Sequence, residues 1–516
     1  MKRLFIIIFV CFAAFRIFAQ SDLLIYEYQN ISGKNYITNK IIEAKEYVFA
    51  GNIDQSYIDT TKNTLTLLIS GTSLKGKWQN NFGNLLLFDL KTGKVIWDKS
   101  IQSEQNSFQL LGDVIIYIND FQCNILNSKN GDVQSEVNTA ICYVDSIHKI
   151  GIGYDINFGS ANTNNLKAID LETGKMLWKR QITHEYGWNN TFHINDSVLI
   201  LESDGLHTIN IKNGKGWDYK TATGKKDYTI TIIRNILGIT LGLFTGTFVT
   251  TSEYELITGI TSNVKIDTSA IYFASRENIS GLDTNGQIIW TTALEKNKIS
   301  NSSIFIKDSL LYMINKGYAF MGNSQINIGK PYFSAYNKHS GKQVFYSPLS
   351  GSKNQIKEYD IRKDTVFLIS EDRISKYSMT NGLNISYKTF ETDTLGKFES
   401  FLGKQVFIKS DSLYYNLASS DSTKHYLITD KNKVLVINNQ LEILQQINID
   451  QLYICYFTNK DYKFLAKGDE TIVIDKNSKI VADFKASQNT KLIGTKLFDV
   501  QGKSVIEIDL SELLGK

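Results

Sequence analysis

The sequence predicts an all-β fold, and three observations lead to this class. Short runs rich in apolar residues recur, as in DVIIYIN (113–119) and DTVFLIS (364–370), and we interpret them as strands with one buried face. The 516 residues include 27 tyrosines and 28 phenylalanines but only two prolines, a composition that favours many paired strands. A hairpin motif also recurs along the chain.

The first residues, MKRLFIIIFVCFAAFRIFAQ, are typical of an export signal. Lys2 and Arg3 precede an apolar run that ends at the small residue Ala19, which is the pattern of a cleaved signal peptide. We therefore predict a signal peptide over residues 1–19 and one propeller-type domain over residues 20–516. The expected location is periplasmic, outer-membrane-associated or extracellular.

The charge of the chain argues against nucleic acid as a partner, and its cysteine content argues against a disulfide-stabilised fold. Removal of residues 1–19 would lower the formal net charge from +4 to +1, so the mature chain has no overall electrostatic attraction for nucleic acid. Cys123, Cys142 and Cys455 then remain. Cys123 and Cys142 could pair across neighbouring strands, but three cysteines are too few for a disulfide framework.

The recurring hairpin defines the organisation of the chain. An apolar strand ends at Asp or Asn, a glycine follows after two or three residues, and the next strand carries an aromatic residue. The five clearest copies are Asp89, Gly93 and Trp97; Asp170, Gly174 and Trp178; Asn210, Gly214 and Trp217; Asp283, Gly286 and Trp290; and Asn337, Gly341 and Phe345. Fainter copies lie at 123–133, 374–386, 434–444 and 471–481, and a last strand lies at 504–510.

Local chemistry explains this motif. An Asp or Asn side chain at the turn entry can accept hydrogen bonds from following backbone N–H groups, and glycine adopts the left-handed φ that closes the hairpin. Tryptophan is a large apolar plate with one N–H, suited to packing between sheets, and four of the six tryptophans occupy this position. We interpret Asp89, Asp170 and Asp283 as turn caps and not as catalytic carboxylates.

The spacing of the hairpins predicts a β-propeller. Each interval holds about four strands in roughly 40–45 residues, the period of a propeller blade. Nine hairpins and a terminal strand occur, whereas a ring usually has four to eight blades; either some hairpins belong to incomplete blades or the ring is unusually large. We predict a single ring of eight four-stranded blades, with seven or more than eight as alternatives. The N-terminal segment is expected to supply the strand missing after 504–510.

The units at 89–97 and 170–178 resemble the tryptophan-docking repeats of PQQ-like β-propellers, and the resemblance extends in weakening form over residues 85–510. The composition and the signal ending in Ile-Phe-Ala-Gln are similar to secreted propellers of Bacteroidetes-type bacteria. The family includes periplasmic quinoprotein alcohol dehydrogenases and non-catalytic propellers such as the propeller lipoprotein of the outer-membrane β-barrel assembly machine. The resemblance therefore implies a fold and leaves the activity open.

The residues that the family's enzymes use have no counterparts here. Those enzymes hold the quinone against a disulfide of adjacent cysteines and bind calcium, whereas this sequence has no adjacent cysteines and no Asp-x-Asp-x-Asp-Gly loop. His184, Glu185 and His193 come closest to a metal pattern, but their spacing matches no common site. A Gly-x-Ser-x-Gly elbow is also missing. We predict no catalytic, cofactor-binding or metal-binding residue.

The long interval between the third and fourth clear hairpins predicts a non-blade insertion at about 222–262. Its centre, 235–251, is apolar, and its glycines recur every four residues, as in packed membrane helices. The run is shorter than the ~20 apolar residues of a spanning helix, and a hairpin is equally compatible. We predict a segment that packs on the ring or contacts a partner or membrane, without a transmembrane span. The glycines are Gly238, Gly242 and Gly246.

These observations predict a non-catalytic exported propeller that acts as a protein-interaction scaffold in the cell envelope and binds a protein partner. The loops that cover the faces of a ring are where functional residues concentrate. One alternative is a quinone-dependent dehydrogenase-like enzyme. Another is a glycan- or peptide-binding propeller that uses surface aromatics such as Trp78 and Trp188.

Overall fold

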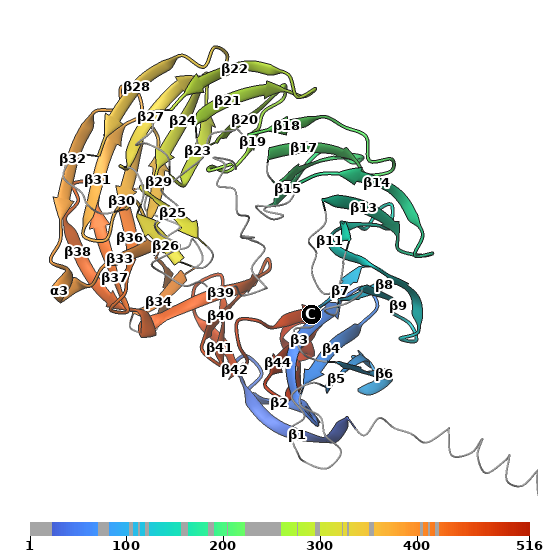
Figure 1. Cartoon of the computed structure of the whole chain (residues 1–516). Helices are drawn as coiled ribbons and strands as arrows, with labels where there is room; N and C mark the ends of the chain where they lie inside the picture. Colours follow the sequence, from blue (N-terminus) through green and yellow to red (C-terminus); the bar gives the residue numbers. More distant parts are fainter. Residues whose placement is uncertain are drawn as a thin grey trace, which may run out of the picture.

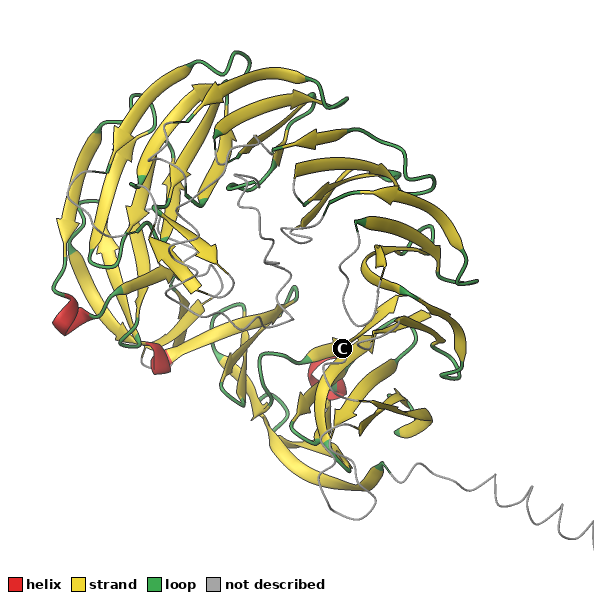
Figure 2. Cartoon of the chain, in the orientation of Figure 1, coloured by secondary structure: helices red, strands yellow, loops and turns green. Residues whose placement is uncertain are grey.

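A computed structural model describes residues 23–515, apart from 71–81, 103–106, 112–113, 119–122, 156–163, 184–189, 204, 222–259, 276, 295–299, 322–323, 328–329, 350–354, 403–405, 411–412 and 418–422. Strands make up nearly all of the regular structure, which confirms the predicted all-β class (Figure 2). Antiparallel four-stranded sheets follow one another around a common centre, so the fold is a β-propeller (Figure 1).

Blades 1 to 5 each consist of four consecutive strands. These are β3 (Asn52–Asp59), β4 (Thr64–Ser70), β5 (Phe82–Asp89) and β6 (Lys94–Gln102); β7 (Ser107–Leu111), β8 (Val114–Ile118), β9 (Cys123–Asn127) and β10 (Val133–Val137); β11 (Thr139–Asp145), β12 (Ile150–Asp155), β13 (Asn165–Asp170) and β14 (Met176–Gln181); β15 (Asn190–Asn195), β16 (Val198–Glu202), β17 (Gly205–Asn210) and β18 (Asp218–Lys220); and β19 (Lys265–Ile266), β20 (Ala270–Ala274), β21 (Asn278–Asp283) and β22 (Ile288–Ala293).

Blades 6 to 9 follow the same plan, except that a hairpin is inserted in blades 6 and 8. Their strands are β23 (Ser302–Lys307), β24 (Leu310–Asn315), β27 (Tyr332–Asn337) and β28 (Gln343–Pro348); β29 (Glu358–Arg362), β30 (Thr365–Ile369), β31 (Arg373–Ser378) and β32 (Asn384–Thr389); β33 (Phe398–Phe401), β36 (Lys424–Thr429), β37 (Lys433–Asn438) and β38 (Ile443–Asn448); and β39 (Leu452–Thr458), β40 (Tyr462–Lys467), β41 (Glu470–Asp475) and β42 (Ile480–Lys485). The inserted hairpins are β25 (Tyr318–Met321) with β26 (Ser324–Asn327), and β34 (Val406–Ser410) with β35 (Leu413–Asn416).

The tenth blade joins the two ends of the chain. It combines β43 (Lys491–Ile493), β44 (Lys496–Gln501) and β45 (Ser504–Asp509) with β2 (Lys40–Phe49) from the N-terminal region. Short helices complete the regular structure of the described residues: α3 (Thr392–Leu395), η2 (Ile449–Gln451) and α4 (Ser511–Leu514).

The predicted number of eight blades is not confirmed. In the described part of the chain, strand pairing gives eight separate four-stranded sheets, and two further sets of four strands lie within an eleven-stranded sheet. Each of the nine sequence hairpins forms the third and fourth strands of a blade of its own. The alternative of more than eight blades agrees with this pairing.

Hydrophobic clusters connect each blade to the next around the whole ring. Between blades 8 and 9 the inserted hairpin intervenes, with Val406 packed against blade 8 and Phe407 against blade 9. The cluster between blades 10 and 1 contains Phe498 and Phe88. The blades therefore form a closed ring of packed neighbours.

The position of a strand within its blade explains which residues it buries. Middle strands are covered on both faces by neighbouring blades, and residues 65–69 of β4 are all buried. A short continuous apolar run is the expected sequence for such a strand. The fourth strand lies at the outer margin, where neighbouring blades diverge (Figure 1). Accordingly, β14 buries Trp178 alone of its six residues.

The N-terminal segment closes the ring. β2 pairs with β45, with Ala44 opposite Ile508, which confirms the prediction that this segment supplies the strand missing after 504–510. β1 (Leu24–Asn35) pairs with the outer side of β2 and, at residues 33–35, with β42 of blade 9. Gly33 permits this crossing, because a Cβ there would lie 1.8 Å from the carbonyl oxygen of Asp483.

Several predictions from the sequence fall outside the described residues. These include the signal peptide at 1–19, the apolar segment at 235–251, and Trp78, Trp188, His184 and Glu185. The predicted insertion at about 222–262 is described only at its end, where Ile260 forms a bridge with Ser275 and Ser262 with Ser302.

Candidate functional site

The polar residues of the recurring hairpin cap the turns between third and fourth strands. Oδ1 of Asp170 accepts hydrogen bonds from the backbone N–H groups of Glu172 and Thr173, at 2.9 and 2.8 Å. Burial opposes ionisation of Asp170, but these backbone bonds and the Thr173 side chain lower its pKa below the usual value. Asp89, Asn210 and Asn337 make the same pair of capping bonds, and Asp283 accepts from the backbone N–H groups of Asn285 and Gln287.

In most of these turns the glycine receives an aromatic side chain from the preceding blade. Trp178 Nε1 donates to the carbonyl oxygen of Ile211 at 2.8 Å, and a Cβ on Gly214 would lie 2.6 Å from the Trp178 ring. Gly214 also has φ +71°, a conformation that costs glycine little. Trp97, Trp217 and Trp290 donate in the same way to Ser128, Thr284 and Lys338, and Phe345 packs on Gly382. The turns at Gly286 and Gly341 receive Trp217 and Trp290.

Two turns receive a different side chain. Gly174 faces Ser135, because blade 2 carries no tryptophan at this position. Gly93 of blade 1 faces Tyr47, which comes from β2. A Cβ on Gly93 would lie 2.6 Å from the Tyr47 ring, so this tyrosine replaces the docking tryptophan at the point where the ring closes.

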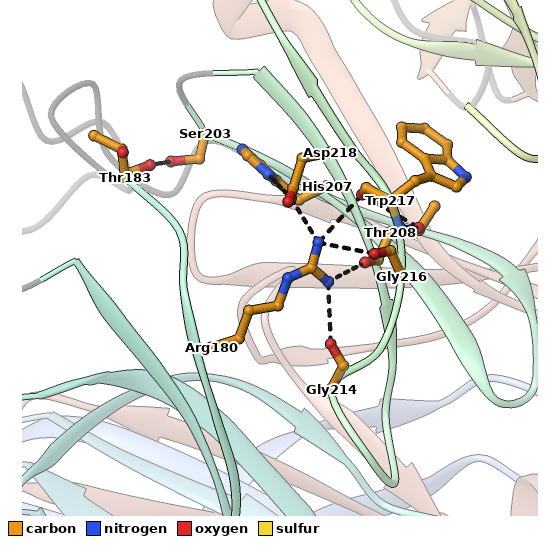
Figure 3. Close-up of polar contacts among 9 residues, drawn as sticks. All are labelled: Arg180, Thr183, Ser203, His207, Thr208, Gly214, Gly216, Trp217 and Asp218. Atoms are coloured by element: carbon orange, nitrogen blue, oxygen red, sulfur yellow. Dashed lines mark hydrogen bonds and ion pairs between the residues drawn. The ribbon is translucent and has the colours of Figure 1, made fainter. Parts of the chain in front are cut away.

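Arg180 connects blades 3 and 4 through a polar cluster that the sequence did not predict (Figure 3). Its guanidinium donates to the carbonyl oxygen of Thr208 at 2.6 Å and to Oδ1 of Asp218 at 2.5 Å. His207 Nδ1 lies 2.6 Å from the same Asp218 oxygen. Burial opposes ionisation of Asp218, but the hydrogen bond with His207 and the charge of Arg180 lower its pKa. Further guanidinium bonds reach the carbonyl oxygens of Gly214, Gly216 and Trp217.

The reason for this cluster is a short turn in blade 4. Only two residues separate Gly214 from Trp217, whereas three separate Gly174 from Trp178. β18 is only three residues long, and the carbonyl groups of Gly214 and Gly216 lie in the turn before it. Arg180 satisfies them, so the cluster holds two blades together.

The described residues contain no group of three or more His, Cys, Asp or Glu side chains that could hold a metal ion. The possible pair Cys123 and Cys142 is not formed; both are free thiols, Cys123 buried and Cys142 exposed. His193, from the closest metal-like pattern, lies 3.0 Å through Nε2 from the Tyr143 hydroxyl. Two surface hollows beside blade 1 measure about 190 and 220 Å³, less than the ~300 Å³ of a typical ligand pocket.

An exposed apolar surface lies on β1, the turn that follows it and the start of β2. We call this the β1 surface; it consists of Ile25, Tyr26, Tyr28, Ile31, Tyr36, Ile37 and Ile41, each 39–70% exposed. Residues 25–31 are exposed without interruption, and β1 lies at the outer margin of the ring (Figure 1). This many exposed apolar side chains on one hairpin indicates an interaction site.

Polar contacts hold the β1 surface in place. Glu27 forms an ion pair with Lys45 at 2.8 Å, and this hydrogen bond raises the pKa of Lys45. The Tyr28 hydroxyl donates to Glu46, and the rings of Tyr26 and Tyr28 stack with centroids 5.7 Å apart. At the far end of the hairpin, the Tyr36 hydroxyl donates to Asp483 at 2.8 Å. The aromatic residues are therefore presented on a tethered strand.

In the described residues, none of the helices has the length and apolar character needed to cross a membrane.

No protein-family model and no curated protein sequence matches the chain. Among solved structures, BamB from Moraxella catarrhalis is 12% identical, with 78% of this chain and 96% of BamB covered at a TM-score of 0.33. The computationally designed Ika8 protein is 11% identical, with 72% and 94% covered at a TM-score of 0.29. A eukaryotic initiation factor is 7% identical, with 71% and 96% covered at a TM-score of 0.35. At these TM-scores the similarities carry no argument about function.

Proposed function

We propose that the protein is an exported, non-catalytic propeller of the PQQ-like type that acts as a protein-interaction scaffold in the cell envelope. The observation that carries the proposal is the β1 surface, on which Ile25, Tyr26, Tyr28 and Ile31 are exposed along one strand. A strand that only had to close the ring would need no such residues, because β2 already completes blade 10. The recurring hairpin residues are occupied in capping and docking, and so support a rigid platform.

The test is site-specific cross-linking in the cell envelope of the source organism. A photo-reactive phenylalanine analogue replaces Tyr26, and a matched control places it at Tyr387, which is 61% exposed on β32. We expect a discrete protein adduct from position 26 and none from position 387. The double variant Tyr26→Ser with Ile31→Ser, at 52% and 70% exposed positions, should lose co-purification of the same protein while keeping its melting temperature.

Three results would contradict the proposal. Equal labelling from both positions, or none from either, would show that the β1 surface is not a specific contact. Tight stoichiometric binding of the quinone in the presence of calcium, with oxidation of an alcohol, would show instead that the protein is an enzyme.

A further inference from the structure

β1 has one free edge along most of its length. β2 pairs with one edge of β1 from Leu24 to Asn35, whereas β42 pairs with the other edge only at residues 33–35. No other strand in the described chain pairs with residues 24–32 of β1. Unpaired backbone groups on an edge strand are a template for another strand.

The backbone hydrogen bonds of β2 determine which residues of β1 face this edge. Phe49 N–H donates to the Lys503 carbonyl, so its backbone groups point toward β45, while Ala50 N–H donates to Leu23. Backbone groups in a strand alternate between its two edges. Val48, Glu46 and Ala44 therefore point toward β1, where they stand opposite Tyr26, Tyr28 and Asn30. By the same alternation, the groups left to the free edge belong to Glu27, Gln29 and Ile31.

The charges of β1 define the chemistry of an occupant. Glu27 is the only charged residue between positions 24 and 33, and Lys45 neutralises it. Residues 24–33 therefore offer no unpaired opposite charge to an incoming charged side chain, and burying an unpaired charge is costly. A strand with apolar and hydroxyl side chains can instead cover Tyr26 and Ile31 on the two faces of β1.

The existing contact with β42 shows that this edge accepts a strand. β42 lies against residues 33–35, with Lys34 opposite Asp483. A second strand could pair with residues 24–32 on the same edge of β1, next to the point where the pairing with β42 ends.

We propose that the free edge of β1 binds an extended, uncharged segment of a partner protein, which adds to the sheet as a strand. This inference rests on the proposed scaffold function and specifies its mode of recognition. Main-chain hydrogen bonds to Glu27, Gln29 and Ile31 supply affinity, and alternate side chains contact the exposed residues of the β1 surface.

The experiment uses a fluorescein-labelled synthetic peptide, Thr-Val-Thr-Ile-Thr-Val-Thr-Ile-Thr with blocked ends, and the mature protein. Fluorescence polarisation compares wild type with Gln29→Pro and the matched control Gln29→Ala. Proline removes the N–H that faces the free edge and leaves the bonds to β2 intact, whereas alanine keeps that N–H. We expect Gln29→Ala to bind within about twofold of wild type and Gln29→Pro to bind at least tenfold more weakly, a loss of about 1.4 kcal/mol.

Amide hydrogen exchange on the wild-type protein gives a second measurement that needs no variant. The peptide should slow exchange at positions 27, 29 and 31 more than at positions 26, 28 and 30, which already bond to β2. A control peptide with proline at its centre should give neither binding nor protection.

Three results would overturn the inference: no peptide binding to wild type, equal binding by the proline and alanine variants, or protection without the alternating pattern. Sedimentation of the protein without peptide tests whether the occupant is a second copy of this chain. If wild type is a dimer and Gln29→Pro is a monomer, a second copy fills the edge and the inference of a partner segment is wrong. The scaffold function fails separately. If cross-linking from Tyr26 gives a specific adduct but the peptide test fails, the scaffold remains and strand addition is wrong.

Discussion

Glu202 is a buried carboxyl group whose ionisation opposes folding. It is the last residue of β16, is 7% exposed and stands opposite Leu206 of β17. Ile200, two residues earlier, packs in the cluster between blades 4 and 5, so the alternation of a strand directs Glu202 toward blade 5. Burial raises the pKa of Glu202 to about 7.

The size of this effect follows from linkage. A pKa raised from 4.5 to about 7 corresponds to roughly 3 kcal/mol, because a tenfold change in proton affinity is worth about 1.4 kcal/mol. Below pH 4.5 the carboxyl is protonated in both the folded and the unfolded state, and no penalty exists. As the pH rises from 4.5 to 7, only the unfolded chain ionises, so the free energy of unfolding falls. Above pH 7 the whole penalty is present.

Glu202→Gln should therefore stabilise the protein at high pH. Urea unfolding of wild type and variant at pH 4.5, 6 and 8 measures the difference in unfolding free energy. We expect this difference to increase in favour of the glutamine variant by about 3 kcal/mol between pH 4.5 and 8. Glu399→Gln, at an exposed position on β33, is the control and should show little change. A difference for Glu202→Gln that does not vary with pH would refute the reasoning.

Three further variants test the blade contacts, each by urea unfolding. Trp178→Ala should lose about 3–5 kcal/mol because it removes a buried ring; an unchanged curve would contradict the docking role. Gly214→Ala should lower the free energy of unfolding clearly more than the control Gly468→Ala, since both glycines have positive φ but a Cβ at 468 meets nothing within 4 Å. Equal losses would mean that the cost comes from backbone strain and not from the contact with Trp178. Arg180→Lys should lose about 2 kcal/mol, because lysine cannot bond to several carbonyl groups at once; a loss below about 0.5 kcal/mol would remove Arg180 as a connector.

The propeller could be predicted because its signal is local. A capping side chain and a turn residue with positive φ are needed wherever a hairpin closes, whatever the neighbouring blades do. Asn438 and Asp475 still cap their turns in blades 8 and 9, although Gln445 and Ala482 occupy the register position of the docking tryptophan. The sequence prediction of eight gave these weaker hairpins too little weight. In the structure each one belongs to a complete blade.

The polar cluster and the β1 surface could not be predicted in the same way. Arg180 is one of many basic residues in the sequence, and its role depends on a turn of blade 4 that is one residue shorter than that of blade 3. Glu202 looks like an ordinary strand-end carboxylate until blade 5 covers it. The sequence predicts one closing strand from the N-terminal segment, and only the pairing of β2 with β45 shows that β1 is additional to the ring.

The β1–β2 hairpin links the proposed binding to the integrity of the ring. Tyr47 of β2 docks on Gly93 of blade 1, and its hydroxyl donates to Glu507 of β45 at 3.2 Å. A partner strand on β1 would bind only when β1 is paired with β2, and β2 holds that position only in the closed ring. Binding to the closed state alone stabilises it by about 2.7 kcal/mol when the ligand is at one hundred times its Kd. Occupation of the free edge should therefore raise the unfolding midpoint of the whole propeller, although β1 itself contributes no buried contact along residues 25–31.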